Sequence, residues 1–181
     1  MGKFLEIFNK SVVTGKFPSR SFDANKWISG NLKKMGKAAA NPVPGTLQFF
    51  HYDPKLKEKL PYYDYLPLVL PIEMYGDSMI GLNFHYLPLN LRVHLLDALL
   101  VLTDDKQITP TARIQASYGI LVAASRFKAM KPCVKKYLFS HIQGGMLTIE
   151  PEGWLSAINM PVTTFQKAGN AKVWSDSRAK I

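Results

Sequence analysis

The sequence predicts an α+β fold, with a small antiparallel β-sheet or partial barrel over about residues 47–86 followed by several helices. Two patterns predict this class. Up to residue 86, short apolar and aromatic runs are separated by turn residues, which is typical of strands. After Pro88, leucines recur at helical spacing. The 181 residues are 47% apolar and 20% charged, so the chain can bury a core and is neither disordered nor a fibrous repeat.

Two extended segments open the predicted sheet. Residues 47–52 are expected to form a strand, which the turn at Asp53-Pro54 ends. Residues 55–59 follow as an exposed loop. Residues 60–67 carry two prolines, so we expect this segment to be extended and to lie at an edge or on the surface.

A β-hairpin is predicted next, with strands over residues 68–75 and 79–86 and a turn at Gly76-Asp77. Pro71 cannot donate a hydrogen bond to a neighbouring strand, so the first strand is expected to lie at an edge or to carry a bulge. Gly81 in the second strand predicts a bulge or a close approach of another backbone.

The second half of the chain is predicted to be mainly helical. One helix spans Leu91 to Leu102 with Asn90 as its cap, and Pro110 begins a second helix whose apolar face runs to Val122. Four further segments are expected: a third helix over residues 134–142 ended by Gly144-Gly145, a short strand over 146–150, a brief helix over 151–158 and a terminal helix over 163–178.

The distribution of charge predicts two units. Residues 1–46 form a basic N-terminal arm that contains aromatic residues, and residues 47–181 form a single compact α+β domain. The net charge is +6 for residues 1–46, −2 for residues 47–125 and +6 for residues 126–181, which gives the formal total of +10. A near-neutral middle between basic ends is typical of a packed body whose ends reach an anionic or acidic partner.

Several classes of protein are excluded or disfavoured. No apolar stretch approaches the roughly 20 residues of a membrane span, so we expect a soluble protein with no membrane partner. Cys133 is the only cysteine, which rules out an internal disulfide, and we expect it to be buried. The glycine motifs of nucleotide-binding loops and of hydrolase nucleophile elbows are missing. We therefore expect no enzyme: no catalytic residue, cofactor, metal site or small-molecule substrate.

A metal-dependent nuclease is one alternative. The closely spaced Asn83, His85 and His94 faintly resemble a ββα-metal site, and metal ions held by acids can cut phosphodiesters. The nearby acids are Asp64, Glu73 and Asp77. The order of residues does not match such nucleases, and acids beside a turn are commonly solvated. Structural histidines and solvated acids are the favoured interpretation.

Two lysine clusters are candidate contacts to DNA or to an acidic partner. They consist of Lys33, Lys34, Lys37, Lys131, Lys135 and Lys136. Lysines that neutralise phosphates gain affinity by releasing counterions, and nearby aromatic rings can stack on bases. The sequence is equally compatible with basic segments that bind acidic protein neighbours in an assembly.

Aromatic residues, most of them between residues 61 and 88, are candidates for a protein interface. The predicted interface residues are Tyr62, Tyr63, Tyr65, Phe84, Tyr86 and Trp27. Aromatic side chains cover a large area at low entropic cost, which suits an interface. The alternative is that these rings form the core of a small barrel.

Four strings in the sequence carry a resemblance to a known group of proteins. They are residues 50–73, residues 81–88 with the leucine-rich helix after them, residues 131–138 and residues 165–174. Together they resemble small virion-associated proteins of T-even-like contractile-tailed bacteriophages, over about residues 45–175 and without the N-terminal arm. Some of these relatives are described as DNA end protectors and others as structural proteins. The resemblance implies a place in a phage particle and no catalytic residue.

The main hypothesis is therefore a non-enzymatic structural component of a contractile-tailed phage particle, located in the tail, baseplate or neck. It would be made in the host cytoplasm, reside in the virion and dock on other virion proteins through aromatic surface and basic termini. The alternative is a protein that binds DNA ends or packaged DNA, which the net charge of +10 favours. The nuclease is the second alternative.

Overall fold

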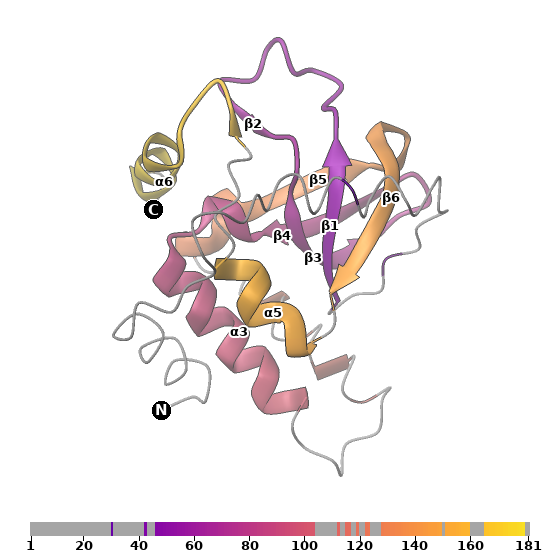
Figure 1. Cartoon of the computed structure of the whole chain (residues 1–181), viewed down its shortest axis with the longest axis vertical. Helices are drawn as coiled ribbons and strands as arrows, with labels where there is room; N and C mark the ends of the chain where they lie inside the picture. Colours follow the sequence, from indigo (N-terminus) through magenta and orange to yellow (C-terminus); the bar gives the residue numbers. More distant parts are fainter. Residues whose placement is uncertain are drawn as a thin grey trace.

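A five-stranded antiparallel sheet forms the centre of the protein (Figure 1), whose structure is a computed structural model. The structure describes residues 46–103, 128–149, 151–159 and 165–179, with isolated positions elsewhere. The order of the strands is β5-β4-β3-β1-β6. Their bounds are Leu47–Tyr52 for β1, Leu68–Met74 for β3, Ser78–Asn83 for β4, Val134–Leu138 for β5 and Ile142–Ile149 for β6. The α+β class is therefore confirmed.

The sheet is curled, because its two edge strands are nearly consecutive in the chain. Only the short 3₁₀ helix η3, Phe139–His141, joins β5 to β6, although a flat sheet would place them about 19 Å apart at 4.8 Å per strand. Three residues of 3₁₀ helix rise only about 6 Å. Two hydrogen bonds fasten the closed end: Leu138 N donates to Tyr52 Oη at 3.2 Å, and Asp53 N donates to the His141 carbonyl at 3.1 Å.

The β3–β4 hairpin is confirmed, with an irregularity at Pro71. Pairing with β4 shifts register between Pro71 and Glu73, so the expected bulge is present. The alternative of an edge strand is wrong, since β3 lies between β4 and β1. Gly81 is opposite Pro71, and a Cβ there would collide with Val69 Cγ1 and lie 2.9 Å from the Leu70 carbonyl oxygen. The close backbone approach predicted for Gly81 is therefore confirmed.

The helix expected over residues 134–142 is wrong, because this segment is extended. β5 pairs with β4 from Val134 to Leu138, and its period of two sends Lys135 and Tyr137 to one face of the sheet. Gly144-Gly145 does not end a helix. It forms a bulge in β6, since Phe50 and His51 are adjacent in β1 while their partners Met146 and Gln143 are not. Gly144 has a φ of 79°, which glycine adopts without strain.

Helices lie on one side of the sheet (Figure 1). Helix α3, Leu89–Thr103, confirms the leucine-rich prediction, although it begins before Asn90, which is therefore not its cap. Helix α5, Pro151–Asn159, packs beside it. The terminal helix α6, Asn170–Ala179, begins later than expected because β7, Phe165–Gln166, pairs with β2, Tyr63–Asp64. The helix predicted from Pro110 and most of the N-terminal arm lie outside the described residues. No helix in the described part of the chain is long and apolar enough to cross a membrane.

The core has two parts, one on each face of the sheet. The larger part joins the sheet to the helices and includes Phe49, Leu82 and Phe84, all fully buried. The smaller part lies on the other face and consists of five buried residues: Phe50, Val69, Met79, Tyr137 and Met146. The segment between β1 and β2 lines a pocket together with Tyr137 of this second face.

Candidate nucleic-acid interface

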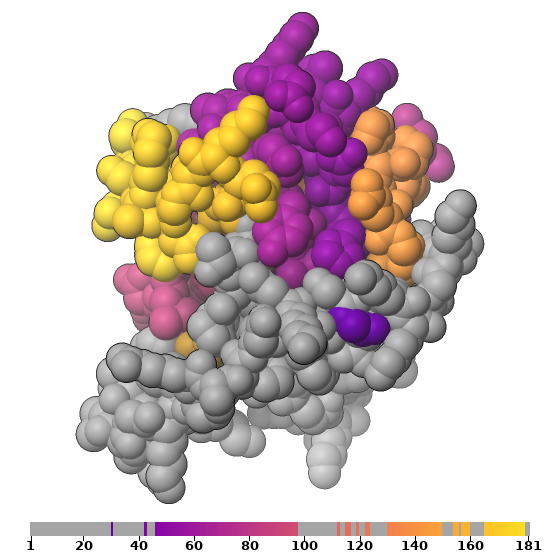
Figure 2. Space-filling model, turned by 45° about the horizontal axis from the view of Figure 1, so that its top comes forward, coloured from indigo at the N-terminus to yellow at the C-terminus, as the bar shows by residue number. Residues whose placement is uncertain are grey.

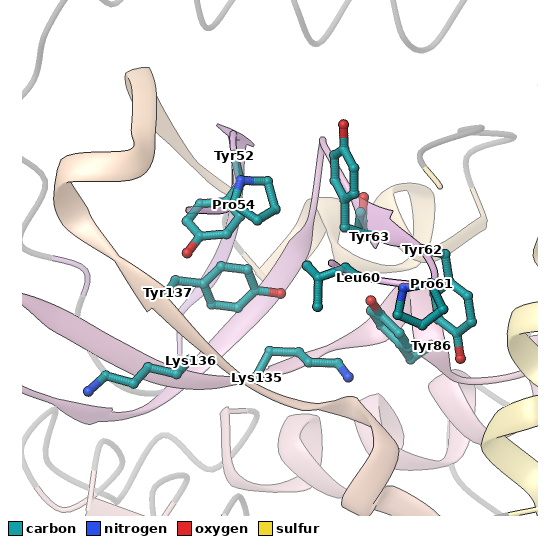
Figure 3. A pocket seen from close by; sticks show the side chains of 11 residues that line it. Tyr52, Pro54, Leu60, Pro61, Tyr62, Tyr63, Tyr86, Lys135, Lys136 and Tyr137 are labelled. Atoms are coloured by element: carbon teal, nitrogen blue, oxygen red, sulfur yellow. The ribbon is translucent and has the colours of Figure 1, made fainter. Parts of the chain in front are cut away.

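A pocket of about 340 Å³ opens where the β1–β2 segment meets the edge strand β5 (Figure 3). Five tyrosines and two lysines dominate its lining. The lining residues are Tyr52, Pro54, Leu60, Pro61, Tyr62, Tyr63, Asp64, Tyr86, Lys135, Lys136 and Tyr137. We call this site the tyrosine pocket. In Figures 1 and 2 the β1–β2 segment projects from the top of the molecule beside α6.

Ring contacts hold two groups of tyrosines in place at opposite ends of the tyrosine pocket (Figure 3). At one end, Tyr52 meets Tyr137 edge to face, with ring centroids 4.9 Å apart. At the other end, Tyr86 contacts Tyr62 at 6.3 Å and Phe165 at 4.9 Å. Edge-to-face pairs stabilise the placement of rings beyond their burial alone. The walls are therefore held by contacts within the chain.

Lys135 is the cation of the tyrosine pocket. Its Nζ lies 4.1 Å from the centroid of the Tyr86 ring, a cation–π distance. Lys136 points the other way, as Figure 3 shows and as alternation along a strand requires. Its Nζ lies 5.7 Å from the Tyr75 ring in the β3–β4 turn. The two adjacent lysines thus place charge inside the pocket and on the surface beside it.

A buried polar network supports the floor. The Asp64 carboxylate accepts hydrogen bonds from Asn83 Nδ2 at 2.9 Å, from the Leu66 amide at 3.1 Å and from His85 Nδ1 at 2.8 Å. Asn83 Nδ2 also donates to Tyr137 Oη at 3.0 Å. Several donors therefore engage the carboxylate from within the protein, as a buried charge requires.

Arg92 of α3 binds the backbone beside this network. Its guanidinium donates to three carbonyl oxygens, those of Leu87, Ile158 and His85. Burial lowers the pKa of Arg92 to about 10, so the side chain remains cationic at neutral pH. The Trp174 indole also donates to the His85 carbonyl at 2.8 Å, which ties α6 to the same structure.

Burial also governs the ionisation of the tyrosines. It raises the pKa of Tyr86 above the ordinary value of tyrosine. It also raises the pKa of Tyr137, which is more deeply buried. Burial is also the main cause of the raised pKa values of Tyr52 and Tyr62. These four hydroxyls are therefore neutral at physiological pH and keep their protons.

The β1–β2 segment is fastened from the opposite side by Lys167. The Lys167 ammonium donates to the carbonyl oxygens of Lys57 at 2.7 Å, Leu60 at 3.2 Å and Glu58 at 3.4 Å. Lys167 itself has a φ of 69°, which is unfavourable for a residue with a Cβ. Together with the β2–β7 pair, this contact fixes the outer wall of the tyrosine pocket.

The structure brings together part of the predicted site. Tyr62, Tyr63, Tyr86, Lys135 and Lys136 line the tyrosine pocket, and they come from segments more than 20 residues apart. Lys131 is exposed on η2, Lys128–Cys133, outside the pocket lining. The remaining clusters, Lys33, Lys34 and Lys37 with Trp27, lie outside the described residues.

Two predicted interface residues have other surroundings. Phe84 is fully buried in the larger core, so it offers no surface to a partner. Tyr65 is partly buried and stacks on His51, with ring centroids 6.4 Å apart. For Phe84, the alternative reading of the aromatic residues as core is the one that the structure supports.

Only some of the candidate nuclease residues come together. Asn83 and His85 are buried around Asp64, while His94 is exposed on α3. Glu73 accepts a hydrogen bond from Tyr75, and Asp77 accepts one from Ser78 at the hairpin turn. Within the described residues, no group of three or more histidines, cysteines and acids is placed to hold a metal ion. Cys133 is buried as predicted, and burial raises the pKa of its thiol to about 12.

Sequence reasoning missed several residues of the site, among them Tyr52, Leu60, Tyr137 and the anchoring Lys167. Tyr137 follows Lys135 by two residues, a spacing that would have placed both on one face had the segment been predicted as a strand. Lys167 carried no local signal, since its partners are more than 100 residues away in the chain.

Comparison with known families identifies the chain's relatives. Residues 4–177 match the family described as "Phage T4 terminal DNA protecting protein". The chain belongs to this family. No curated protein and no solved structure matches it. The resemblance to T-even-like phage proteins is thus confirmed, but its predicted limits are wrong, because the family match includes nearly all of the N-terminal arm.

Membership also bears on the competing hypotheses. The family's description names protection of terminal DNA and neither a reaction nor a tail, baseplate or neck. It therefore favours the DNA-end alternative over the structural role that was the main hypothesis. The chain is a bacteriophage protein of a family described by what it does to DNA.

Proposed function

We propose that this protein binds the ends of phage DNA and shields them. Membership of a family described as protecting terminal DNA, over residues 4–177, carries the proposal. The net charge of +10 supports it, because binding to DNA draws most of its affinity from neutralised phosphates.

We propose that the tyrosine pocket takes part in this binding. Tyrosine faces beside a lysine ammonium are the chemistry with which proteins hold bases and phosphates of exposed strands. The pocket is held by the described contacts of Lys167 and of the β2–β7 pair, so little ordering is needed on binding. Protection then follows from occlusion, since a bound end is inaccessible to exonucleases.

A titration of the purified protein tests the proposal. Linear duplex and covalently closed circular duplex of the same sequence are compared at about 50 and 200 mM salt, where phosphate-driven binding changes steeply. We expect tighter binding to linear DNA and, with as few as three phosphate contacts, roughly 40-fold weakening between the two salt concentrations. Equal affinity for circles and ends, or no binding at low salt, would contradict the proposal.

Protection is measured separately. Linear DNA saturated with the protein is treated with a double-strand exonuclease, and a restriction enzyme that cuts at an internal site serves as the control. We expect slower digestion from the ends and unchanged internal cutting. Equal inhibition of both nucleases would show a general coating of DNA and would contradict end protection.

We further propose that the protein travels in the virion with the DNA it binds. A protein that remains on DNA ends after packaging would be present in purified particles at a few copies per genome end. Quantitative mass spectrometry of intact particles and of particles emptied of DNA checks this. Retention in emptied particles would favour docking on other virion proteins, as first hypothesised, over residence on DNA.

A further inference from the structure

We propose that the tyrosine pocket holds a single unpaired nucleotide at the end of a DNA strand, with its base against the tyrosine rings and its phosphate near Lys135. This inference rests on the proposed function and specifies its ligand. Three properties of the pocket point to this ligand: its volume, the aromatic ring faces in its lining and the position of its positive charge.

The size of the tyrosine pocket suits one nucleotide. Its volume of about 340 Å³ lies at the lower end of the roughly 300–1,000 Å³ typical of sites for small ligands. A duplex is far too wide to enter, because its major groove alone is roughly 12 Å across. The pocket lining comes from a loop, from strands and from the short 3₁₀ helix η1, Phe84–Tyr86, and no α-helix of the described residues contributes to it. What can enter is a nucleotide that has left its base pair.

The lining offers ring faces and neutral hydroxyls to a base. Tyr63 stands on β2 near Leu60, while Tyr52 and Tyr137 lie at one end and Tyr62 and Tyr86 at the other (Figure 3). Rings stack on any base, which suits a protein that must accept DNA ends of different sequence. Burial raises the pKa of Tyr52 and Tyr86, so their hydroxyls stay protonated and can donate to base oxygens and nitrogens, whereas the Tyr62 hydroxyl is already hydrogen-bonded to Asp176.

The charges of the pocket favour a phosphate near Lys135. Its Nζ lies over the Tyr86 ring, whereas Lys136, which also lines the pocket, points the other way. The one carboxylate in the lining, Asp64, already accepts hydrogen bonds from Asn83, His85 and the Leu66 amide. These hydrogen bonds from within the protein weaken the repulsion between Asp64 and a bound phosphate. The two lysines of the lining can then attract the phosphate.

Such a pocket would distinguish an end from the interior of DNA. An interior base can enter only after unpairing and unstacking, which costs a few kcal/mol. A terminal nucleotide lacks one stacking neighbour and opens more easily. Selectivity for ends therefore follows from the cost of opening the strand and needs no contact with a particular sequence.

Binding to three hairpin-based duplexes tests the inference with the full chain. Each has one end sealed by a loop, and the other end is sealed, blunt or forked by two unpaired nucleotides. We expect the forked end to bind tightest and the doubly sealed duplex weakest. Tyr63→Ala should reduce affinity for the forked end roughly 5- to 150-fold, the range observed when one stacking ring is lost. Tyr63→Phe, which keeps the ring face, should retain the affinity.

Matched variants separate the pocket from general charge and aromaticity. Tyr75→Ala removes a ring that is 47% exposed in the β3–β4 turn, and it should leave the preference for forked ends unchanged. Lys135→Gln should weaken binding to the forked end more than Lys131→Gln does, although each removes one positive charge. Equal effects of the two lysine variants would overturn the placement of the phosphate.

A photochemical measurement on the unaltered protein does not depend on how the variants fold. 5-Iodo-2′-deoxyuridine is placed at the terminal nucleotide or eight pairs inside, and cross-linked peptides are identified by mass spectrometry. Cross-links from the terminal position to residues 52–63, 86 or 135–137 support the inference, and cross-links elsewhere overturn it. Free ends that outbind sealed ends, with blunt equal to forked, would overturn the inference but leave end binding intact. Equal binding of all three duplexes would contradict end binding itself.

Discussion

Two regions of this protein use aromatic residues in different ways. In the larger core, Phe49 and Phe84 are fully buried among leucines, and their rings contact only the protein. In the tyrosine pocket, Tyr62 and Tyr63 remain partly exposed beside Lys135. The core rings lack a polar atom, whereas each pocket ring carries a hydroxyl. The hydroxyl and the neighbouring cation, more than the ring itself, therefore distinguish the aromatic residues of the tyrosine pocket from those of the core.

Loss of a core ring should destabilise the protein far more than loss of a pocket ring. Phe49→Ala should lower the free energy of unfolding by about 3–5 kcal/mol, because it removes a fully buried ring and leaves a cavity. Tyr63→Ala should cost only about 1 kcal/mol, since its ring is partly exposed. Urea unfolding followed by circular dichroism measures both. Similar losses for the two variants would show that the pocket ring is part of the core.

Alkaline pH should destabilise the protein through two buried tyrosines of the pocket. Burial raises the pKa of Tyr86 and Tyr137 above that of tyrosine in the unfolded chain, about 10. Their neutral forms therefore stabilise the fold fully below pH 10, and this contribution is lost as pH rises toward the folded pKa values. We expect a loss of about 1.4 kcal/mol per pH unit for each tyrosine above pH 10.

Urea unfolding at successive pH values from 8 to 11 checks the sign and the slope. Tyr137→Phe should reduce the slope above pH 10, and Tyr75→Phe at the exposed turn is the matched control. Burial also raises the pKa of Cys133 to about 12, so its thiol begins a similar loss from about pH 9 in all three proteins. Stability that is flat from pH 8 to 11 would be inconsistent with neutral, buried tyrosines.

Removal of the Lys167 anchor should loosen the pocket wall with little loss of global stability. Lys167→Met removes the hydrogen bonds to the Lys57, Glu58 and Leu60 carbonyls but keeps an apolar stem. Because Lys167 is exposed, we expect a loss of global stability below about 1 kcal/mol. Limited proteolysis should nevertheless cut residues 54–62 faster. Lys172→Met, which removes an exposed lysine of α6 paired with Asp176, should leave that cutting rate unchanged.

Local patterns in the sequence predicted much of the sheet and of the leucine-rich helix. Alternation and turn residues determine a strand or a hairpin within about ten residues of chain. Pro71 and Gly81 correctly predicted the bulge and the close backbone approach in the hairpin. The segment after Cys133 was mistaken for a helix because its strand character comes from pairing with β4, more than 50 residues earlier. Tertiary pairing overrides local propensity in such cases.

The candidate site was less accessible to sequence reasoning, for the same reason. Tyr62 and Lys135 were each singled out, but nothing local places them in one pocket. Lys131 and Lys135 belong to one cluster in the sequence, but only Lys135 lies on the strand that lines the pocket, whereas Lys131 lies on η2 outside it. The N-terminal arm was judged to lie outside the resemblance, whereas the family match includes it.

The pairing of β1 with β6 has a consequence for synthesis and folding. Leu47 pairs with Ile149, which lies 102 residues later in the chain, so one edge of the apolar strand β1 is unpaired until β6 has been synthesised. At a translation rate of roughly 5–20 residues per second, that partner leaves the ribosome some 5–20 s after β1. The β3–β4 hairpin is local and can cover the other edge of β1 early. Contacts of such sequence separation slow folding, so we expect β6 to join the sheet after the β3–β4 hairpin has formed.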